Sequence, residues 1–155
     1  SNEITPNFIQ EIDSGKWAEK KQGIDFINTT INETNNKILL NGLKELFNLI
    51  KGKLNDGNQN LVRMIIQLLD HLIIALGTQI KYYSKILIYP LLQKFSDKNQ
   101  QIREDCLNCI NNWIKIQNFE VVAIYIPSLL LTENFYLREE LIKLLNITKN
   151  SITDD

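Results

Sequence analysis

Glycine and proline are scarce in this chain, and their scarcity limits the choice of fold. Six glycines and three prolines punctuate 155 residues. A β-sandwich or β-barrel needs many tight turns, and such turns draw heavily on these two residues. The apolar residues instead recur every three or four positions along most of the chain, which is the period of an amphipathic helix. We therefore expect an all-α fold.

Side chains that carry chemistry are also few. The chain has one histidine, His71, and two cysteines, Cys106 and Cys109. A structural zinc site needs four ligands, and a redox CxxC pair belongs in a βαβ setting, so neither site is supported by this spacing alone. Both cysteines fall on the apolar stripe of a predicted helix, and His71 lies on a polar stripe. With no glycine-rich phosphate loop either, we expect a non-catalytic protein with no metal and no cofactor.

Strong charge of one sign is missing as well. The net charge is −1 and the isoelectric point is about 5.9. Nucleic acids and anionic membranes bind basic faces, so we expect neither as a partner. The apolar runs read as too short for a membrane-spanning helix, and the N-terminus has no signal-peptide pattern. We therefore expect a cytoplasmic protein with free thiols.

The most apolar segment, residues 59–77, is the centre of the predicted fold. Its polar residues recur at helical spacing and leave the other sides of the helix apolar, so the helix must be covered on most of its circumference. The predicted central core positions are Ile65, Leu69, Leu72 and Leu76.

Short polar turns recur along the chain. Each contains an acidic residue, and these acids, Asp13, Asp56, Asp97 and Glu133, are 43, 41 and 36 residues apart. Periods near 40 with two helices each are typical of HEAT repeats. The sequence therefore predicts one domain, an α-solenoid of four HEAT-type hairpins at about 5–35, 38–77, 80–117 and 119–148. The predicted helices are 6–12, 17–35, 38–54, 59–77, 80–95 with a kink at Pro90, 102–117, 119–131 and 136–147, followed by a frayed tail.

Stacked hairpins would place the four turns on one edge, the natural binding surface. Its first half is the more basic, because Lys16, Lys20 and Lys21 crowd the first turn and Lys53 flanks the second. Trp17, directly after the first turn, either staples the turn to the helix behind it or stands out as an interface anchor.

Four further expectations concern the rest of the surface. Gly23 allows a close neighbour against its helix. Arg103, six residues after Asp97, suits an Asp/Arg ladder between neighbouring repeats. The charges Glu33, Glu139, Glu140 and Lys143 are interpreted as solvated helix faces. The last helix shows Leu137, Leu141, Leu144 and Leu145 with no following repeat, which predicts a partly open apolar face.

Five segments of the sequence carry a family resemblance. They are KWAEKKQGID (16–25), LIKGKLNDGNQNLV (49–62), ALGTQIK (75–81), FSDKNQQIRE (95–104) and ENFYLREEL (133–141). The first resembles the opening Trp-Lys-x-Arg-Lys-Glu-Gly-Leu pattern of TOG domains, the tubulin-binding HEAT arrays of microtubule polymerases. Ala18 and Lys20 stand where that pattern has Lys and Arg. The set is most similar to the fourth TOG domain of such an array.

The resemblance implies αβ-tubulin or microtubules as the partner, bound through the turns between paired helices. The residues it points to, together with the basic flanks of the first two turns, are Lys16, Trp17, Lys20, Lys53, Asn58, Gln59 and Lys98. It also implies six repeats in a complete domain, of which four are present, neighbouring TOG domains in the same protein, and a location on the spindle or a microtubule-organising centre. The alternative is a HEAT scaffold or array spacer that binds little tubulin itself.

Overall fold

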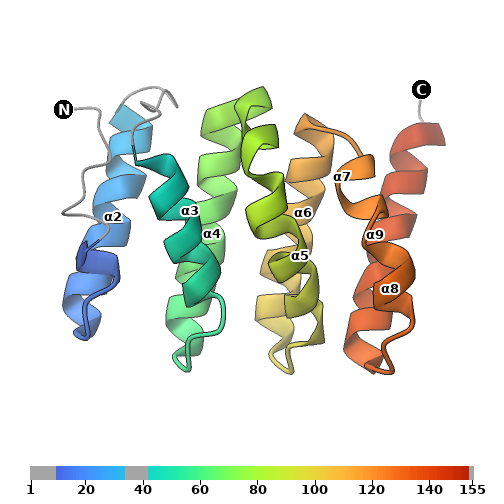
Figure 1. Cartoon of the computed structure of the whole chain (residues 1–155), viewed down its shortest axis with the longest axis horizontal. Coiled ribbons are helices and arrows are strands. Elements are labelled where there is room, and N and C mark those ends of the chain that lie inside the picture. The colour runs from blue at the N-terminus through green and yellow to red at the C-terminus, as the bar shows by residue number, and fades with distance from the viewer. Residues whose placement is uncertain (1–9, 34–41, 154–155) are drawn as a thin grey trace.

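A computed structural model describes residues 10–33 and 42–153 of the chain. All of the regular structure in these two ranges is helical, and they contain no strand. Helices stand side by side in a row that runs from the N-terminus to the C-terminus (Figure 1). In chain order they are α2 (Trp17–Glu33), α3 (Leu43–Lys53), α4 (Gln59–Leu76), the 3₁₀ helix η1 (Gly77–Tyr83), α5 (Ser84–Gln93), the 3₁₀ turn η2 (Lys94–Ser96), α6 (Gln100–Ile116), α7 (Glu120–Ala123), α8 (Ile126–Leu130) and α9 (Phe135–Thr153).

The row has two layers, as the all-α HEAT-solenoid prediction requires. Helices α2, α4, α6 and α9 pack in sequence along one layer, and α3, α5 and α7 along the other. From α3 onward, each hairpin joins helices of the two layers. The predicted first helix, 6–12, lies mostly outside the described residues, and only its last turn, 10–12, is described as helical.

Helix α4 is the centre of the core, as predicted. Ile65, Leu69 and Leu72 are fully buried, and Leu76 is 8% exposed. The helix packs against α2, α3 and α6, so three sides of its circumference are covered. Asn58 caps its first turn by accepting hydrogen bonds from the backbone N–H groups of Asn60 and Leu61, which satisfies donors that a helix N-terminus leaves open.

One expectation about apolar length was wrong. Among the described residues, Gln59–Ser96 is long and apolar enough to cross a membrane by length and composition, and half of its most apolar window is buried. The stretch is not one helix. It comprises α4, η1, α5 and η2, with Gly77 at φ +57° between the first two. Many of its apolar residues pack into the solenoid core, whereas Ile74, Tyr82 and Tyr89 are exposed.

Two helix starts differ from the prediction. Helix α3 begins at Leu43, directly after Gly42, whose φ of +82° is outside the helical range, and the predicted start at 38 lies outside the described residues. Helix α5 begins at Ser84 and not at 80, since η1 occupies the preceding residues. Pro90 lies inside α5, which continues to Gln93 before the backbone tightens into η2.

The segment predicted as one helix from 119 to 131 is two short helices, α7 and α8. Pro127 stands in the first turn of α8. Proline has no backbone N–H and cannot donate to the carbonyl four residues earlier, so α7 stops and α8 starts afresh. The same residue at a helix start costs little, because that N–H would have no partner there.

The last helix corrects the open-face prediction. Leu137, Leu141 and Leu144 are at most 3% exposed because they point inward, toward α6, η2 and α8. Leu145 is 37% exposed and Ile142 is 55% exposed, and Phe135 and Tyr136 at the start of α9 are exposed as well. The helix also runs past the predicted end at 147, as far as Thr153.

Glu140 was expected on a solvated helix face, and that expectation was wrong. Its side chain is 1% exposed and lies between the cations of Arg103 and Lys143, at 3.5 and 3.2 Å. Burial of a carboxylate is tolerated here because two cations compensate its charge.

Gly23 lies where α2 meets the helical turn before it, as predicted for a close neighbour. A Cβ added there would be 3.0 Å from Cγ1 and 3.2 Å from the backbone N of Ile12. We predict that Gly23→Ala lowers the free energy of unfolding by about 1–3 kcal/mol through overpacking. The matched control is Gly52→Ala in α3, where a Cβ meets nothing within 4 Å, and a gain of about 0.4–1 kcal/mol is expected. Denaturation followed by circular dichroism measures both. Equal stabilisation by the two alanines would contradict the close contact.

Candidate functional site

Four turns between paired helices lie along one edge of the row, the lower edge in Figure 1. We call this surface the turn edge. Its segments are 13–16, 54–58, 97–99 and 131–134, and each leads into a helix of the same layer. The opposite edge carries η1 and the link between α6 and α7. The sequence prediction that all four turns share one edge is therefore confirmed.

The first turn presents an exposed basic and an exposed aromatic side chain of the predicted site, Lys16 and Trp17. Ser14 accepts from the backbone N–H of Lys16 at 3.1 Å, and its hydroxyl donates to Glu19. The Ser14 hydrogen bond lowers the pKa of Glu19. Lys16 lies 3.6 Å from Glu19, yet its side chain remains 81% exposed. Trp17 is 40% exposed, so it offers part of its ring to a partner.

The second and third turns have the same internal frame. In each, an aspartate accepts from the backbone N–H of the asparagine two residues later, at 2.8 Å for both Asp56 with Asn58 and Asp97 with Asn99. The asparagine side chain then caps the next helix. The predicted contact residue Asn58 therefore has its side-chain oxygen committed to α4.

Two of the predicted basic residues link neighbouring hairpins. Lys53 lies 2.9 Å from Asp13, and Lys20 lies 3.7 Å from Asp56. Both lysine side chains are about 15% exposed (16% and 15%). The two pairs cross between the first and second turns, so much of the positive charge predicted for this half of the edge is compensated within the protein.

The remaining predicted residues lie at the second and third turns. The side-chain carbonyl of Gln59 accepts from the amide of Asn99 at 2.7 Å, which joins the two turns. Lys98 is exposed at the tip of the third turn. The structure thus brings all seven predicted residues to one edge, with Lys16, Trp17 and Lys98 as those that point most freely to solvent.

Links between later hairpins differ from the predicted Asp/Arg ladder. Arg63 of α4 lies 2.8 Å from Asp105 and donates to Gln101 at 3.1 Å, both on α6. Arg103 donates to the backbone carbonyls of Asp97 and Lys98, not to the Asp97 carboxylate, and its charge faces Glu140 of α9. The tie between repeats was expected, but the acid that makes it was not identified.

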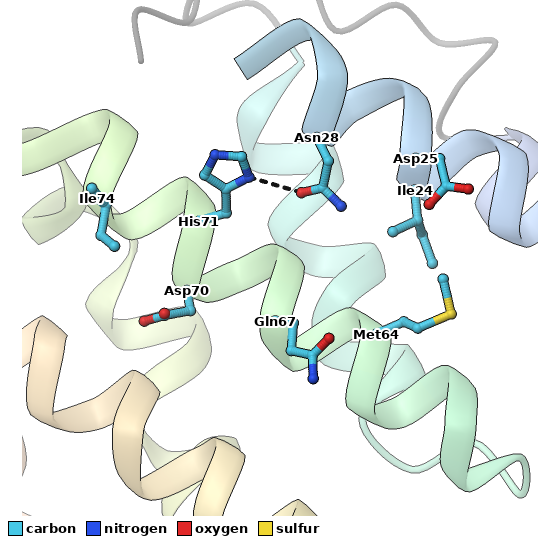
Figure 2. A pocket seen from close by; sticks show the side chains of 8 residues that line it. All are labelled: Ile24, Asp25, Asn28, Met64, Gln67, Asp70, His71 and Ile74. Carbon is cyan, nitrogen blue, oxygen red and sulfur yellow. Dashed lines mark hydrogen bonds between the residues drawn. The ribbon is translucent and has the colours of Figure 1, made fainter. Parts of the chain in front are cut away.

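Apart from the turn edge, the structure has a pocket between α2 and α4 (Figure 2). It has a volume of about 490 Å³ and is lined by both polar and apolar side chains. His71 Nδ1 lies 2.9 Å from Asn28 Oδ1 across the groove, and Asp70 accepts from Asn112 at 2.8 Å. The histidine is thus hydrogen-bonded between hairpins, in line with its predicted role.

Both thiols are buried against the core. Burial raises the pKa of Cys106 and of Cys109 far above the ordinary range, so neither is a thiolate near neutral pH and neither is a nucleophile there. Within the described ranges, no group of three or more His, Cys, Asp or Glu side chains could hold a metal ion.

Sequence reasoning missed one regular signal of the turns. In three turns, an asparagine side-chain oxygen accepts a hydrogen bond from a backbone N–H at the start of the next helix; these residues are Asn58, Asn99 and Asn134. Asparagine is among the preferred N-cap residues, so these three positions mark where the second helix of each of the last three hairpins begins.

Comparisons with known proteins agree with this geometry. No family model matches the chain. It is 28% identical over 126 residues to MOR1 of Arabidopsis thaliana, covering 81% of the chain and 6% of that protein. It is 24% identical over 142 residues to centrosomal protein 224 of Dictyostelium discoideum, covering 90% of the chain and 7% of that protein. The chain therefore spans a small fraction of the curated relatives it matches.

Solved structures decide the fold. The MAST/Orbit N-terminal domain superposes with a TM-score of 0.82 at 15% identity, covering 95% of the chain and 66% of that domain. A structure of microtubule polymerases with TOG domain arrays, described in terms of tubulin recruitment, superposes with a TM-score of 0.79 at 15% identity, covering 94% of the chain and 30% of that structure. This chain has the fold of a TOG domain. The TOG fold places the turn edge along one side of the solenoid, where all seven predicted contact residues lie.

The thiols give a direct test of whether either cysteine could act as a catalytic nucleophile. In the folded protein at pH 8 we predict that Cys106 and Cys109 fail to react with a thiol-reactive disulfide, because burial keeps both protonated and inaccessible. Absorbance of the released thiol measures the reaction. Ser128→Cys, on the exposed side of α8, is the control and should react at once. Reaction of the native thiols at the rate of that control would reopen a catalytic role.

Proposed function

We propose that this TOG domain is a non-catalytic module that binds αβ-tubulin through its turn edge. The observation that carries the proposal is the alignment of four turns on one edge, with Trp17 and Lys16 exposed at the first. A partly exposed tryptophan beside an exposed lysine suits an acidic partner surface, since Trp is enriched at interface hot spots and opposite charge speeds association.

The proposed contact set is Lys16, Trp17, Lys20, Lys53, Asn58, Gln59 and Lys98. Within it, Lys16, Trp17 and Lys98 are exposed and available to a partner, and Lys16 remains 81% exposed although Glu19 lies 3.6 Å away. Lys20, Lys53, Asn58 and Gln59 act mainly by holding the turns in line. The likeness to structures of tubulin-recruiting polymerases supports tubulin as the partner.

The setting proposed for the module follows from its relatives. A location on the microtubule cytoskeleton, at the spindle or a microtubule-organising centre, is supported by the likeness to a protein named for the centrosome. We propose that the chain is one domain of an array, most like the fourth, and that its four hairpins belong to a six-repeat domain. Its coverage of 66% of the MAST/Orbit domain supports this count.

A second function remains, a scaffold or array spacer that docks a neighbouring TOG domain or another protein. It is favoured by the pairing of Lys20 with Asp56 and of Lys53 with Asp13. Those pairs remove from the edge half of the lysines on which a strong attraction to an acidic partner would depend.

Trp17→Ala decides between the two functions. An interface tryptophan typically contributes at least about 2 kcal/mol, so the affinity for purified αβ-tubulin should fall roughly thirtyfold while the melting temperature barely moves. Binding is measured by gel filtration and fluorescence titration. The matched control is Tyr82→Ala, since Tyr82 is a 73% exposed aromatic in η1, off the turn edge, and its loss should leave binding unchanged.

Two outcomes would count against the proposal. Loss of stability in Trp17→Ala would make the tryptophan a structural staple of the first turn. Unchanged binding by a folded variant, or no binding by the native chain, would leave the scaffold function.

A further inference from the structure

The third turn is held by an arginine of α6, the helix that follows it. Nη1 of Arg103 donates to the backbone carbonyls of Asp97 and Lys98, at 2.8 and 3.1 Å. The arginine side chain is 10% exposed. One buried guanidinium thus fixes two consecutive peptide groups at the tip of the turn that presents Lys98. Because both bonds come from a charged donor, they are stronger than neutral ones.

The charge of that arginine is compensated from the next hairpin. The Glu140 carboxylate on α9 lies 3.5 Å from Nε of Arg103, and the ring of Tyr136 lies 4.2 Å from the guanidinium carbon. The glutamate is 1% exposed, and Lys143 lies 3.2 Å from the same oxygen, Oε1, that faces Arg103. Arg103 is therefore enclosed between its own turn and the fourth hairpin.

The neighbouring turns show that this arrangement is specific to the third. The second turn has the same Asp-Asn frame, but Val62 occupies the position four residues after its cap, where the third turn has Arg103. In the fourth turn Arg138 donates to the Thr132 carbonyl at 2.9 Å, yet its side chain is exposed. Among the described turns, the third alone has its arginine buried under another hairpin.

We propose that Glu140 is a positioning residue for the turn edge, which acts through Arg103 to fix the third turn and hence the place of Lys98. The proposal rests on the proposed tubulin-binding function. Removing one partner of a buried ion pair leaves the other charge uncompensated. Without the carboxylate, Arg103 turns toward water, and the carbonyls of Asp97 and Lys98 lose their donor. The third turn then samples several conformations, so Lys98 no longer has a single position on the turn edge.

Amide hydrogen exchange by NMR tests the positioning without any partner. In Glu140→Gln, the Asn99 amide should exchange about tenfold faster or more, while the Asn58 amide, which has the same hydrogen bond in the second turn, changes little, since exchange reports local opening. Glu139→Gln, on the exposed side of the same helix, is the control and should alter neither. Equal acceleration of both amides would show a purely global role for Glu140 and overturn the proposal.

Arg103→Lys keeps the positive charge opposite Glu140 but lacks the rigid guanidinium whose Nη1 reaches both carbonyls. It should accelerate exchange at Asn99 in the same selective way. This variant decides the matter where Glu140→Gln does not fold. Unchanged exchange at Asn99 in a folded Arg103→Lys protein would overturn the proposal.

Tubulin binding then tests the consequence. Glu140→Gln should weaken binding roughly threefold or more in the native background and have little effect in a Lys98→Ala background, since coupled residues are non-additive. Additive losses would show that Glu140 does not act through Lys98. A different result is that neither the native protein nor any variant binds tubulin, while Glu140→Gln still accelerates exchange selectively at Asn99. That result would reject the proposed function and leave the positioning of the turn established.

Discussion

The fold depends on the burial of α4 on most of its circumference. A helix that is apolar on several sides cannot be satisfied by one partner, so it is covered by α2, α3 and α6 together. Nine of its residues are buried, including Leu69 and Leu72. Covering one layer from both flanks generates a stack, and in a stack of hairpins every turn of one kind falls on the same edge. The hydrophobic effect thus sets the geometry of the surface proposed to bind tubulin.

Ion pairs align the turns at that surface. The pairs Lys53 with Asp13 and Arg63 with Asp105 join successive hairpins near the turns. These pairs are partly exposed, and ion pairs near the surface contribute little stability, at most about 1 kcal/mol each. Their effect is to fix the register of one turn against the next. The turn edge therefore has a stiff row of turns, and Lys16 remains 81% exposed on it although Glu19 lies 3.6 Å away.

The sequence was sufficient for features that depend on periodicity. Helix α4, its core leucines and the common edge of the turns follow from apolar spacing and from the repeat, both of which are local patterns. Helix boundaries were less predictable where the backbone conformation decides them, as at Gly42, which has a positive φ directly before α3. The break before Pro127 was missed because a proline can either kink a helix or begin one.

The candidate site was predictable in place but not in detail. Which acid meets which cation depends on how far adjacent hairpins are offset, and sequence does not give this offset. Glu140 was therefore assigned to the surface, whereas it is buried beside Arg103. In the same way, Lys53 was counted as a free cation, although Asp13 of the preceding turn lies 2.9 Å away.

The central claim is that the turn edge, and not the opposite edge, meets tubulin. Hydrogen exchange of the chain with and without purified αβ-tubulin, followed by mass spectrometry, tests it most directly. The account predicts slower exchange at 13–17, 54–59 and 97–99 and no change at Gly77–Tyr83 or 117–119 on the opposite edge. Protection of the opposite edge, with the turns unaffected, would contradict it.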